Sequence, residues 1–222
     1  MNRMTRTSAF VAALLVAAVA AAAAAGQLKT PADWKWRLDT PGAVVEAATP
    51  GAADARFVAM PPGWHVTTGP GVLLYHPDYL GKGNFAVEAE IFLFPGDSQE
   101  EYGLFLGGRN LGPSESPTYV AFVARRDGKG AAIQRGGAAP AVEWQANDAI
   151  LPHSGTDAVK NILRVEVGAV TVVFSANGKE VLRMPRAGLA LDGPFGFRVG
   201  QGINLHASRL DVTYKLAPVP VK

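Results

Sequence analysis

Apolar and polar side chains alternate along many short stretches of this sequence. In the clearest stretch, Phe85–Phe94, every second residue up to Leu93 is apolar, and Glu88 and Glu90 fall between them. Because successive side chains of a β-strand point to opposite faces of a sheet, this period of two predicts a strand that is buried on one side. The chain must therefore hide one face of a sheet against a second layer.

Similar stretches follow one another from Gly63 onward, separated by glycine and proline. Asn177-Gly178 predicts a type I′ turn that joins two strands in a hairpin, since both central residues of that turn need positive φ. The run Asp127–Gly130 predicts a second hairpin. Many short strands at this spacing, with no helical pattern between them, predict an all-β fold: a two-sheet antiparallel β-sandwich.

The alternation also predicts which side chains face the interior. The residues expected there are Phe85, Val87, Ala89, Ile91, Leu93, Leu163, Val165, Val167, Val170, Val172, Phe174, Phe195, Phe197 and Val199. In the last strand, Leu210, Val212 and Tyr214 are expected to share one face.

The N-terminus has the pattern of a secretory signal peptide, residues 1–25. Arg3 and Arg6 precede an uninterrupted apolar run that ends in small residues, and no acidic residue accompanies them. A retained membrane anchor is the less favoured alternative, because alanine is weakly apolar and the run is shorter than the ~20 residues that span a bilayer. We therefore predict an exported protein, periplasmic or extracellular.

The rest of the chain is predicted to have three parts. Residues 26–62 form an extended segment packed on the sandwich, residues 63–216 form the sandwich, and residues 217–222 form a tail.

Charge and composition exclude several classes of function. The chain has 21 Lys plus Arg and 19 Asp plus Glu, so it is neutral without Arg3 and Arg6, which excludes the basic surface of a nucleic-acid-binding protein. The absence of cysteine excludes disulfides, thiolate metal sites and a cysteine nucleophile. The four histidines show no metal-ligand spacing, so we expect no metal and no cofactor. No segment after the signal peptide is apolar enough for stable membrane insertion, and no pattern specifies an oligomeric state.

The order of these stretches resembles a known family. The stretches that carry the resemblance are Gly63-Trp64, "GNFAVEAEIFLF" (83–94), "YGLFLGGRN" (102–110), "YVAFVARRDGKGAAIQR" (119–135), "VEW" (142–144), "NILRVEVGAVTVVFSANGKEVL" (161–182) and "GPFGFRVGQGINLHASRLDVTY" (193–214). Together they resemble the concanavalin A-like lectin/glucanase jelly roll, and within it the 3-keto-disaccharide hydrolase domains, close to laminin-G-like modules. The resemblance implies a jelly-roll fold and a saccharide as ligand or substrate.

Glu88 and Glu90 are the candidate catalytic residues. Their spacing of two puts both carboxylates on one face of a strand, where a pair of acids can act as general acid and base or as nucleophile. The glucanases of this superfamily carry the pattern Glu-x-Asp-x-x-Glu, whereas this chain has Glu at position 90 and Leu at position 93. The competing interpretation is a solvated strand face whose acids pair with Arg109 or Arg126.

Aromatic side chains next to polar ones suggest a site for a sugar. The apolar C–H faces of sugar rings pack on flat aromatic surfaces, and their hydroxyls need polar partners. The candidate ligand-binding residues are Arg109, Asn110, Tyr119, Phe92, Trp144 and Arg198. The sequence thus predicts a non-catalytic domain that binds a saccharide on the concave face of one sheet. The alternatives are a glycoside hydrolase or lyase acting on (3-keto-)disaccharides or glycosides, and a laminin-G-like protein-interaction module.

Overall fold

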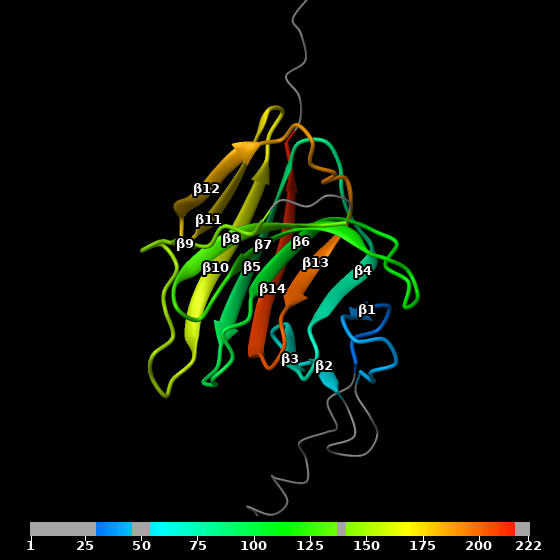
Figure 1. The fold of residues 1–222 in the computed structure, drawn as a ribbon, viewed down its shortest axis with the longest axis vertical. Helices are drawn as coiled ribbons and strands as arrows, with labels where there is room; N and C mark the ends of the chain where they lie inside the picture. Colours follow the sequence, from blue (N-terminus) through cyan, green and yellow to red (C-terminus); the bar gives the residue numbers. More distant parts are fainter. Residues whose placement is uncertain (1–29, 46–53, 137–140, 216–222) are drawn as a thin grey trace, which may run out of the picture.

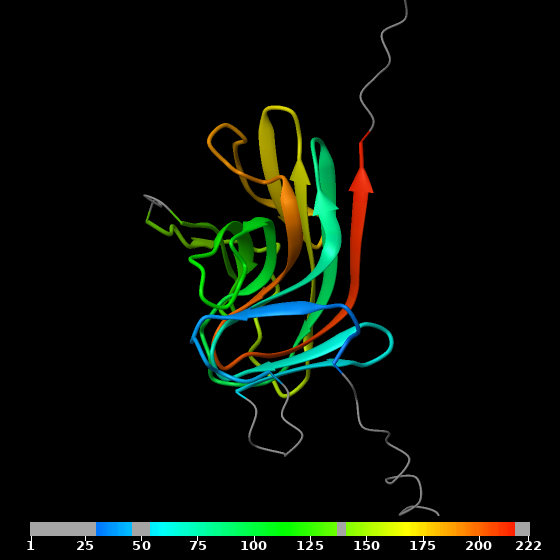
Figure 2. The same cartoon turned by 90° about the vertical axis from the view of Figure 1, so that its right-hand side faces the viewer.

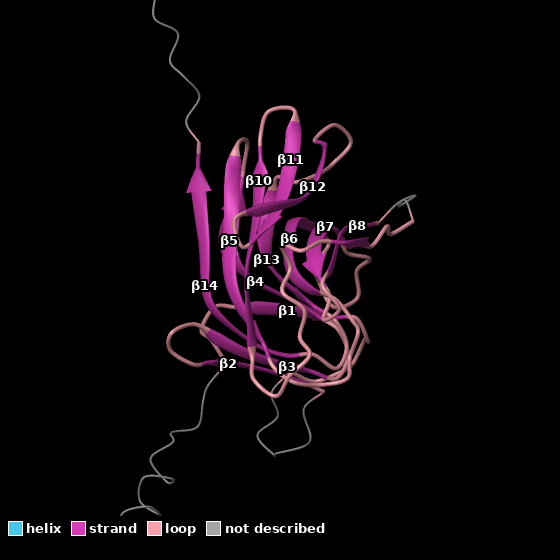
Figure 3. Cartoon of the chain, turned by 90° about the vertical axis from the view of Figure 1, so that its left-hand side faces the viewer, coloured by secondary structure: helices cyan, strands magenta, loops and turns pink. Residues whose placement is uncertain are grey.

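The computed structural model describes residues 30–45, 54–136 and 141–215, and within these ranges the regular structure is all β (Figures 1 and 3). The strands are β1 (Lys35–Leu38), β2 (Ala55–Ala59), β3 (Trp64–Thr68), β4 (Val72–Gly81), β5 (Phe85–Leu93), β6 (Tyr102–Arg109), β7 (Thr118–Ala124), β8 (Lys129–Arg135), β9 (Gln145–Ala146), β10 (Val159–Val167), β11 (Thr171–Ala176), β12 (Lys179–Pro185), β13 (Gly193–Val199) and β14 (Asn204–Tyr214). The described residues contain no helix that is long and apolar enough to cross a membrane. The predicted signal peptide (1–25), the residues 26–29 that follow it and the predicted tail (217–222) lie outside the described residues.

The strands form two antiparallel sheets of seven strands each. Sheet A has the order β1-β4-β13-β6-β7-β8-β9, and sheet B has the order β12-β11-β10-β5-β14-β3-β2. The segment before Gly63 supplies one edge strand to each sheet, because β1 pairs with β4 and β2 pairs with β3. The predicted two-sheet jelly-roll sandwich is thereby confirmed.

Local turn chemistry places several strands as expected. Asn177 and Gly178 both have positive φ (50° and 79°) and join β11 to β12, and the three consecutive strands β10, β11 and β12 lie side by side in sheet B. The side chain of Asn177 also accepts a hydrogen bond from the Ile162 N–H at 2.9 Å and donates one to the Ala149 carbonyl at 2.8 Å. The turn is therefore fixed by its φ preference and by contacts to two other segments.

The inner faces of the two sheets pack against each other and form the main core. Nearly all of the predicted inward residues belong to it; Phe85, Val87, Ala89, Leu163 and Phe174 are completely buried. Val170 was predicted wrongly: it is 75% exposed, because β11 begins only at Thr171 and Val170 lies in the preceding turn.

Trp34 anchors the N-terminal segment in this core. Its ring stacks on Phe197 (centroids 5.9 Å apart, interplanar angle 9°) and lies 4.9 Å from the ring of Trp64 and 5.2 Å from that of Phe57. Only 5% of Trp34 is exposed. The segment before β2 is therefore part of the hydrophobic core.

Trp34→Ala is expected to lower the free energy of unfolding by about 3–5 kcal/mol, because it removes a large buried ring and leaves a cavity between three aromatic side chains. Trp36→Ala is the matched control: Trp36 is 39% exposed, and its loss should cost less than about 1 kcal/mol. Urea unfolding followed by circular dichroism measures both. Equal effects of the two substitutions would contradict the packing described here.

Candidate functional site

The predicted site residues lie on two opposite faces of the sandwich. Glu88, Glu90 and Phe92 are on β5 and point away from the core on the outer side of sheet B. The other five predicted residues are on or next to strands of sheet A: Arg109 at the end of β6, Asn110 after it, Tyr119 on β7, Trp144 before β9 and Arg198 on β13. Because the whole sandwich separates the two groups, Glu88 and Glu90 share no cleft with Arg109.

The outer face of sheet A is covered by a second apolar cluster. Its members are Leu73, Phe105, Leu111, Tyr119, Ala121, Val123, Ala131 and Ile133, and Tyr75 and Trp144 pack against it. Phe105, Val123 and Ala131 are completely buried, and burial raises the pKa of Tyr119. This face is a packed layer, so Tyr119 offers little of its ring to a ligand.

Arg198 and Glu101 are buried charges on the same face, and the exposed Asp39 pairs with Arg198. Its guanidinium donates to Asp39 Oδ1 and Oδ2 at 2.8 and 2.7 Å, and to Glu101 Oε1 at 3.0 and 3.1 Å, while Arg198 is only 5% exposed. Burial raises the pKa of Glu101, but the charge and hydrogen bonds of Arg198 outweigh it, so the net shift is downward. Arg198 thus ties the loop after β1 to β6 and β13, and its donors are engaged within the protein.

Trp144 is also engaged within the protein. The guanidinium carbon of Arg125 lies 3.7 Å from the centroid of the Trp144 ring, which is the geometry of a cation–π contact. One face of the indole is therefore covered by an arginine. Arg109 and Asn110 are exposed, and Asn110 has a positive φ of 53°.

On sheet B, both candidate catalytic acids are held in ion pairs. Glu88 accepts from Arg209 at 2.6 Å and from Arg164 at 3.4 Å. Glu90 accepts from the Ser208 hydroxyl at 2.7 Å and from Lys160 Nζ at 3.3 Å. The expectation that Arg109 or Arg126 would pair with these acids was wrong, because the strands that flank β5 are β10 and β14.

The charge state of Glu90 follows from these contacts. The hydrogen bond from Ser208, followed by the contact with Lys160, lowers the pKa of Glu90 below its ordinary value although burial opposes it. A general acid in glycoside hydrolysis needs a raised pKa so that it carries a proton near neutral pH. Glu90 is instead stabilised as a carboxylate.

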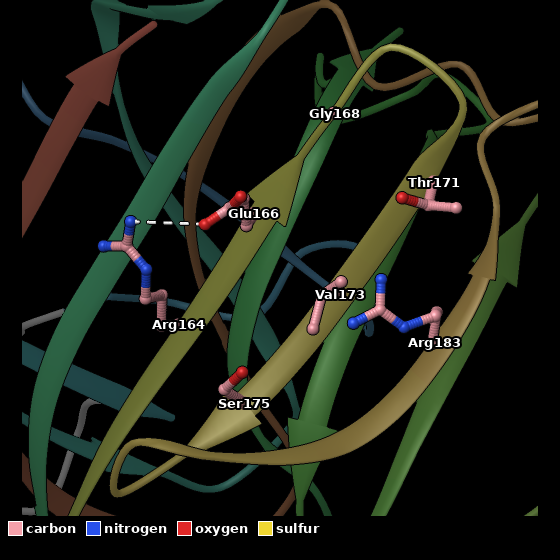
Figure 4. A pocket seen from close by; sticks show the side chains of 7 residues that line it. All are labelled: Arg164, Glu166, Gly168, Thr171, Val173, Ser175 and Arg183. Atoms are coloured by element: carbon pink, nitrogen blue, oxygen red, sulfur yellow. Dashed lines mark ion pairs between the residues drawn. The ribbon is translucent and has the colours of Figure 1, made fainter.

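A shallow hollow of about 210 Å³ lies on the outer side of β10, β11 and β12 (Figure 4). It is lined by Arg164, Glu166, Gly168, Thr171, Val173, Ser175 and Arg183. Arg164 contacts Glu166 at 3.7 Å, and Arg183 pairs with Glu180 at 2.5 Å. The lining offers hydroxyls and guanidinium groups to a polar ligand but contains no aromatic ring.

Four rings gather where β3, β14 and β5 lie side by side, and we call His65, Phe92, Phe94 and His206 the His–Phe patch. The ring centroids of His65 and Phe94 are 5.5 Å apart, those of His206 and Phe92 are 6.3 Å apart, and those of the two histidines are 6.4 Å apart. All four side chains are partly exposed. Thr67 and Asn204 lie directly beside them, with their side chains 3.3 Å apart. The patch therefore combines flat surfaces with polar groups.

Each histidine of the patch has one ring nitrogen that is buried. His206 Nε2 is 2.8 Å from the Pro62 carbonyl oxygen, which only accepts, so Nε2 carries a proton. Nδ1 of His206 and Nδ1 of His65 are both buried and have no hydrogen-bond partner among the described residues. Burial, followed by the charge of His206, lowers the pKa of His65, so His65 is neutral at pH 7.

Sequence reasoning missed the two histidines because they are far apart in the chain. His65 and His206 become neighbours only through the antiparallel pairing of β3 with β14, where they lie directly opposite each other. The only hint in the sequence was that each histidine lies between apolar residues of an alternating stretch, which places its side chain on the outer face of a strand. Phe92 and Phe94 lie on the face of sheet B opposite the core, where both are partly exposed.

Comparison with known proteins identifies the fold. A carbohydrate-binding module, CBM66, from Bacillus subtilis superposes with a TM-score of 0.52 at 12% identity, over 71% of this chain and 91% of that chain. A protein of unknown function with a galectin-like fold, also from Bacillus subtilis, gives 0.54 at 13% identity, over 81% and 88%. The carbohydrate recognition domain of Emp46p, in its potassium-bound form, gives 0.51 at 10% identity, over 81% and 88%.

The chain has a galectin-like jelly-roll fold. This agrees with the predicted jelly-roll fold. No family model and no curated protein matches the sequence, so the resemblance to 3-keto-disaccharide hydrolase domains stays a prediction.

Arg198→Met is expected to cost about 3–5 kcal/mol of stability at pH 7, because it leaves the buried Glu101 carboxylate without its counter-charge. The loss should shrink as the pH falls toward 4.5, the ordinary value for glutamate: the lowered pKa of Glu101 stabilises the wild type only above that range, and the variant is relieved when Glu101 takes up a proton. Arg183→Met, on an exposed pair, is the control and should cost less than about 1 kcal/mol. A pH-independent difference between Arg198→Met and the wild type would contradict this account.

The pKa of His65, measured by NMR titration of its ring protons, is expected to lie below 6.5 and to rise in His206→Asn, which removes the neighbouring charge. His76→Asn is the control and should leave it unchanged. Because the folded-state pKa is lowered, the contribution of His65 to stability is fully present above pH 6.5, the unfolded value, and is lost as the pH falls from there through the folded-state pKa. A pKa at or above 6.5 in the wild type would contradict the buried environment described for this ring.

Proposed function

We propose that this protein is a non-catalytic carbohydrate-binding domain that holds a saccharide on the outer face of sheet B, against the His–Phe patch. The observation that carries the proposal is the clustering of four partly exposed rings on β3, β14 and β5 beside the polar side chains of Thr67 and Asn204. Export through a cleaved leader at residues 1–25 is part of the proposal, since it would bring the domain to extracellular or periplasmic glycans.

The chemistry of the patch suits a sugar ring. The C–H face of a pyranose packs on Phe92 and Phe94, which removes apolar surface from water. Its hydroxyls exchange hydrogen bonds with the side chains of Thr67 and Asn204, which lie directly beside the rings.

The similar structures support the class of ligand. One is titled a carbohydrate-binding module and another a carbohydrate recognition domain, and both share the fold of this chain. At this low sequence identity, the similarity to these proteins shows only a shared fold. The argument for binding therefore rests on the residues of the patch.

The geometry favours binding over hydrolysis. Glu88 is shared by two arginines, and Glu90 is held as a carboxylate by Ser208 and Lys160. Charged rim groups of this kind can accept hydrogen bonds from sugar hydroxyls. The alternative, a hydrolase of 3-keto-disaccharides or other glycosides with Glu88 or Glu90 as acid or base, has no geometric support on this face.

Phe92→Ala and His206→Ala are each expected to weaken binding about tenfold, because each removes one wall of the patch. A glycan array of neutral and acidic oligosaccharides identifies the ligand, and calorimetric titration with the strongest glycan measures the affinities. Trp144→Ala, on the opposite face, is the control and should bind as the wild type does.

Two outcomes would contradict the proposal. One is the absence of carbohydrate binding at millimolar concentration by the folded wild type. The other is a loss of binding in Trp144→Ala with none in Phe92→Ala, which would move the site to sheet A.

A further inference from the structure

Strand β14 is covered on one side by β5 along its whole length, but on its other side only at its beginning. Its partner there, β3, pairs with residues 204–207, whereas 209–214 pair with β5 alone. Figure 2 shows the second half of β14, in red, standing at the margin of sheet B above the β2–β3 hairpin. Within the described part of the chain, this half of β14 is therefore an open sheet edge.

The backbone groups on this edge can be assigned from the ladder. In an antiparallel pair, the N–H and C=O groups of alternate residues point to opposite neighbours. Lys215 N–H donates to the Asn84 carbonyl on the β5 side at 3.0 Å, so Lys215, Thr213 and Asp211 face β5. Leu210, Val212 and Tyr214 consequently present their N–H and C=O groups to the open edge. Such a row of backbone groups is a template for another strand.

Exposed apolar side chains lie beside the same edge. Val212 is 39% and Tyr214 52% exposed, and at the end of β4 in sheet A Tyr79 is 38% and Leu80 48% exposed. The Tyr214 hydroxyl donates to the Leu80 carbonyl, which brings the two strands together. These residues account for four of the nine exposed large hydrophobic side chains in the described ranges.

The sequence of the edge is complementary to itself. In an antiparallel pair of two β14 edges with the two-fold axis at Thr213, Val212 lies opposite Tyr214 of the second copy and Asp211 lies opposite Lys215 of the second copy. Each apolar and each charged pair occurs twice, and two threonines meet at the axis, all of which are favourable cross-strand pairs.

Neighbouring registers lack this complementarity. An axis at Val212 would place Arg209 opposite Lys215, and an axis at Asp211 would place two aspartates opposite each other, so both oppose like charges. An axis between two residues would oppose edge-facing backbone groups to groups that already face β5. Of these three registers, only the axis at Thr213 places opposite charges against each other.

We propose that two copies of this chain associate through antiparallel pairing of residues 211–215 at the free edge of β14. The two B sheets then form one continuous sheet, and the Val212 and Tyr214 side chains of both copies are covered at the junction. Because the two-fold axis is perpendicular to the sheet, both His–Phe patches lie on the same side of the dimer. If the proposed function holds, the dimer binds glycans bivalently.

Reversal and exchange of the two charges test this interface without a sugar. Asp211→Lys opposes Lys215, and Lys215→Asp opposes Asp211, so each single variant is expected to weaken the dimer about tenfold. The double variant Asp211→Lys/Lys215→Asp restores opposite charges and should regain most of the affinity. Lys179→Asp, at the exposed start of β12, is the control for a change of net charge and should dimerise as the wild type does.

Sedimentation velocity over a range of concentrations measures the dissociation constants of the full chain after removal of its leader, and circular dichroism verifies that each variant is folded. A concentration-dependent dimer that both single variants weaken and the double variant restores supports the proposal. A wild type that remains monomeric at its highest soluble concentration overturns the proposal. The open edge would then be available for pairing with an extended peptide of another protein instead. A dimer that all three variants form equally well also overturns it.

Discussion

The burial of the inner faces of the two sheets against each other is the interaction on which every other feature depends. Residues such as Val87, Leu163, Phe174 and Phe197 are completely removed from water only because both layers are present. At about 25 cal/mol per Å² of apolar surface, this burial is the main favourable term in folding. Successive side chains of a strand point to opposite faces, so each side chain that points into the core leaves its neighbours on the outer face. Burial of the inner faces therefore also determines which residues lie on the two outer faces.

The two outer faces have different properties. On sheet A the face is closed by the cluster around Phe105 and by the Asp39–Arg198–Glu101 charges, which together fasten the N-terminal segment. On sheet B the face carries ion pairs, a shallow hollow and the His–Phe patch, and its rings remain partly open. The outer face of sheet A therefore contributes to the stability of the fold, whereas the outer face of sheet B has polar groups and rings that are open to solvent.

The sequence predicts the parts of this structure that depend on local periodicity. Alternation identifies the buried face of β5, and Asn177-Gly178 identifies the β11–β12 hairpin, since both signals come from neighbouring residues. Val170 escaped the pattern because a turn residue two positions before Val172 fits the same alternation as a strand residue. The assignment of strands to sheets depends on long-range pairing, so Glu88 and Arg198 were placed in one site although they lie on opposite faces. The meeting of His65 with His206 depends on the same kind of pairing.

Amide chemical-shift mapping by NMR, with the strongest saccharide from a glycan array, tests the central claim most directly. The account predicts that the largest shifts occur at His65, Phe92, Phe94, Asn204 and His206, and that those around Tyr119 and Trp144 stay small. Shifts confined to sheet A, with β3, β5 and the first half of β14 unaffected, would contradict it.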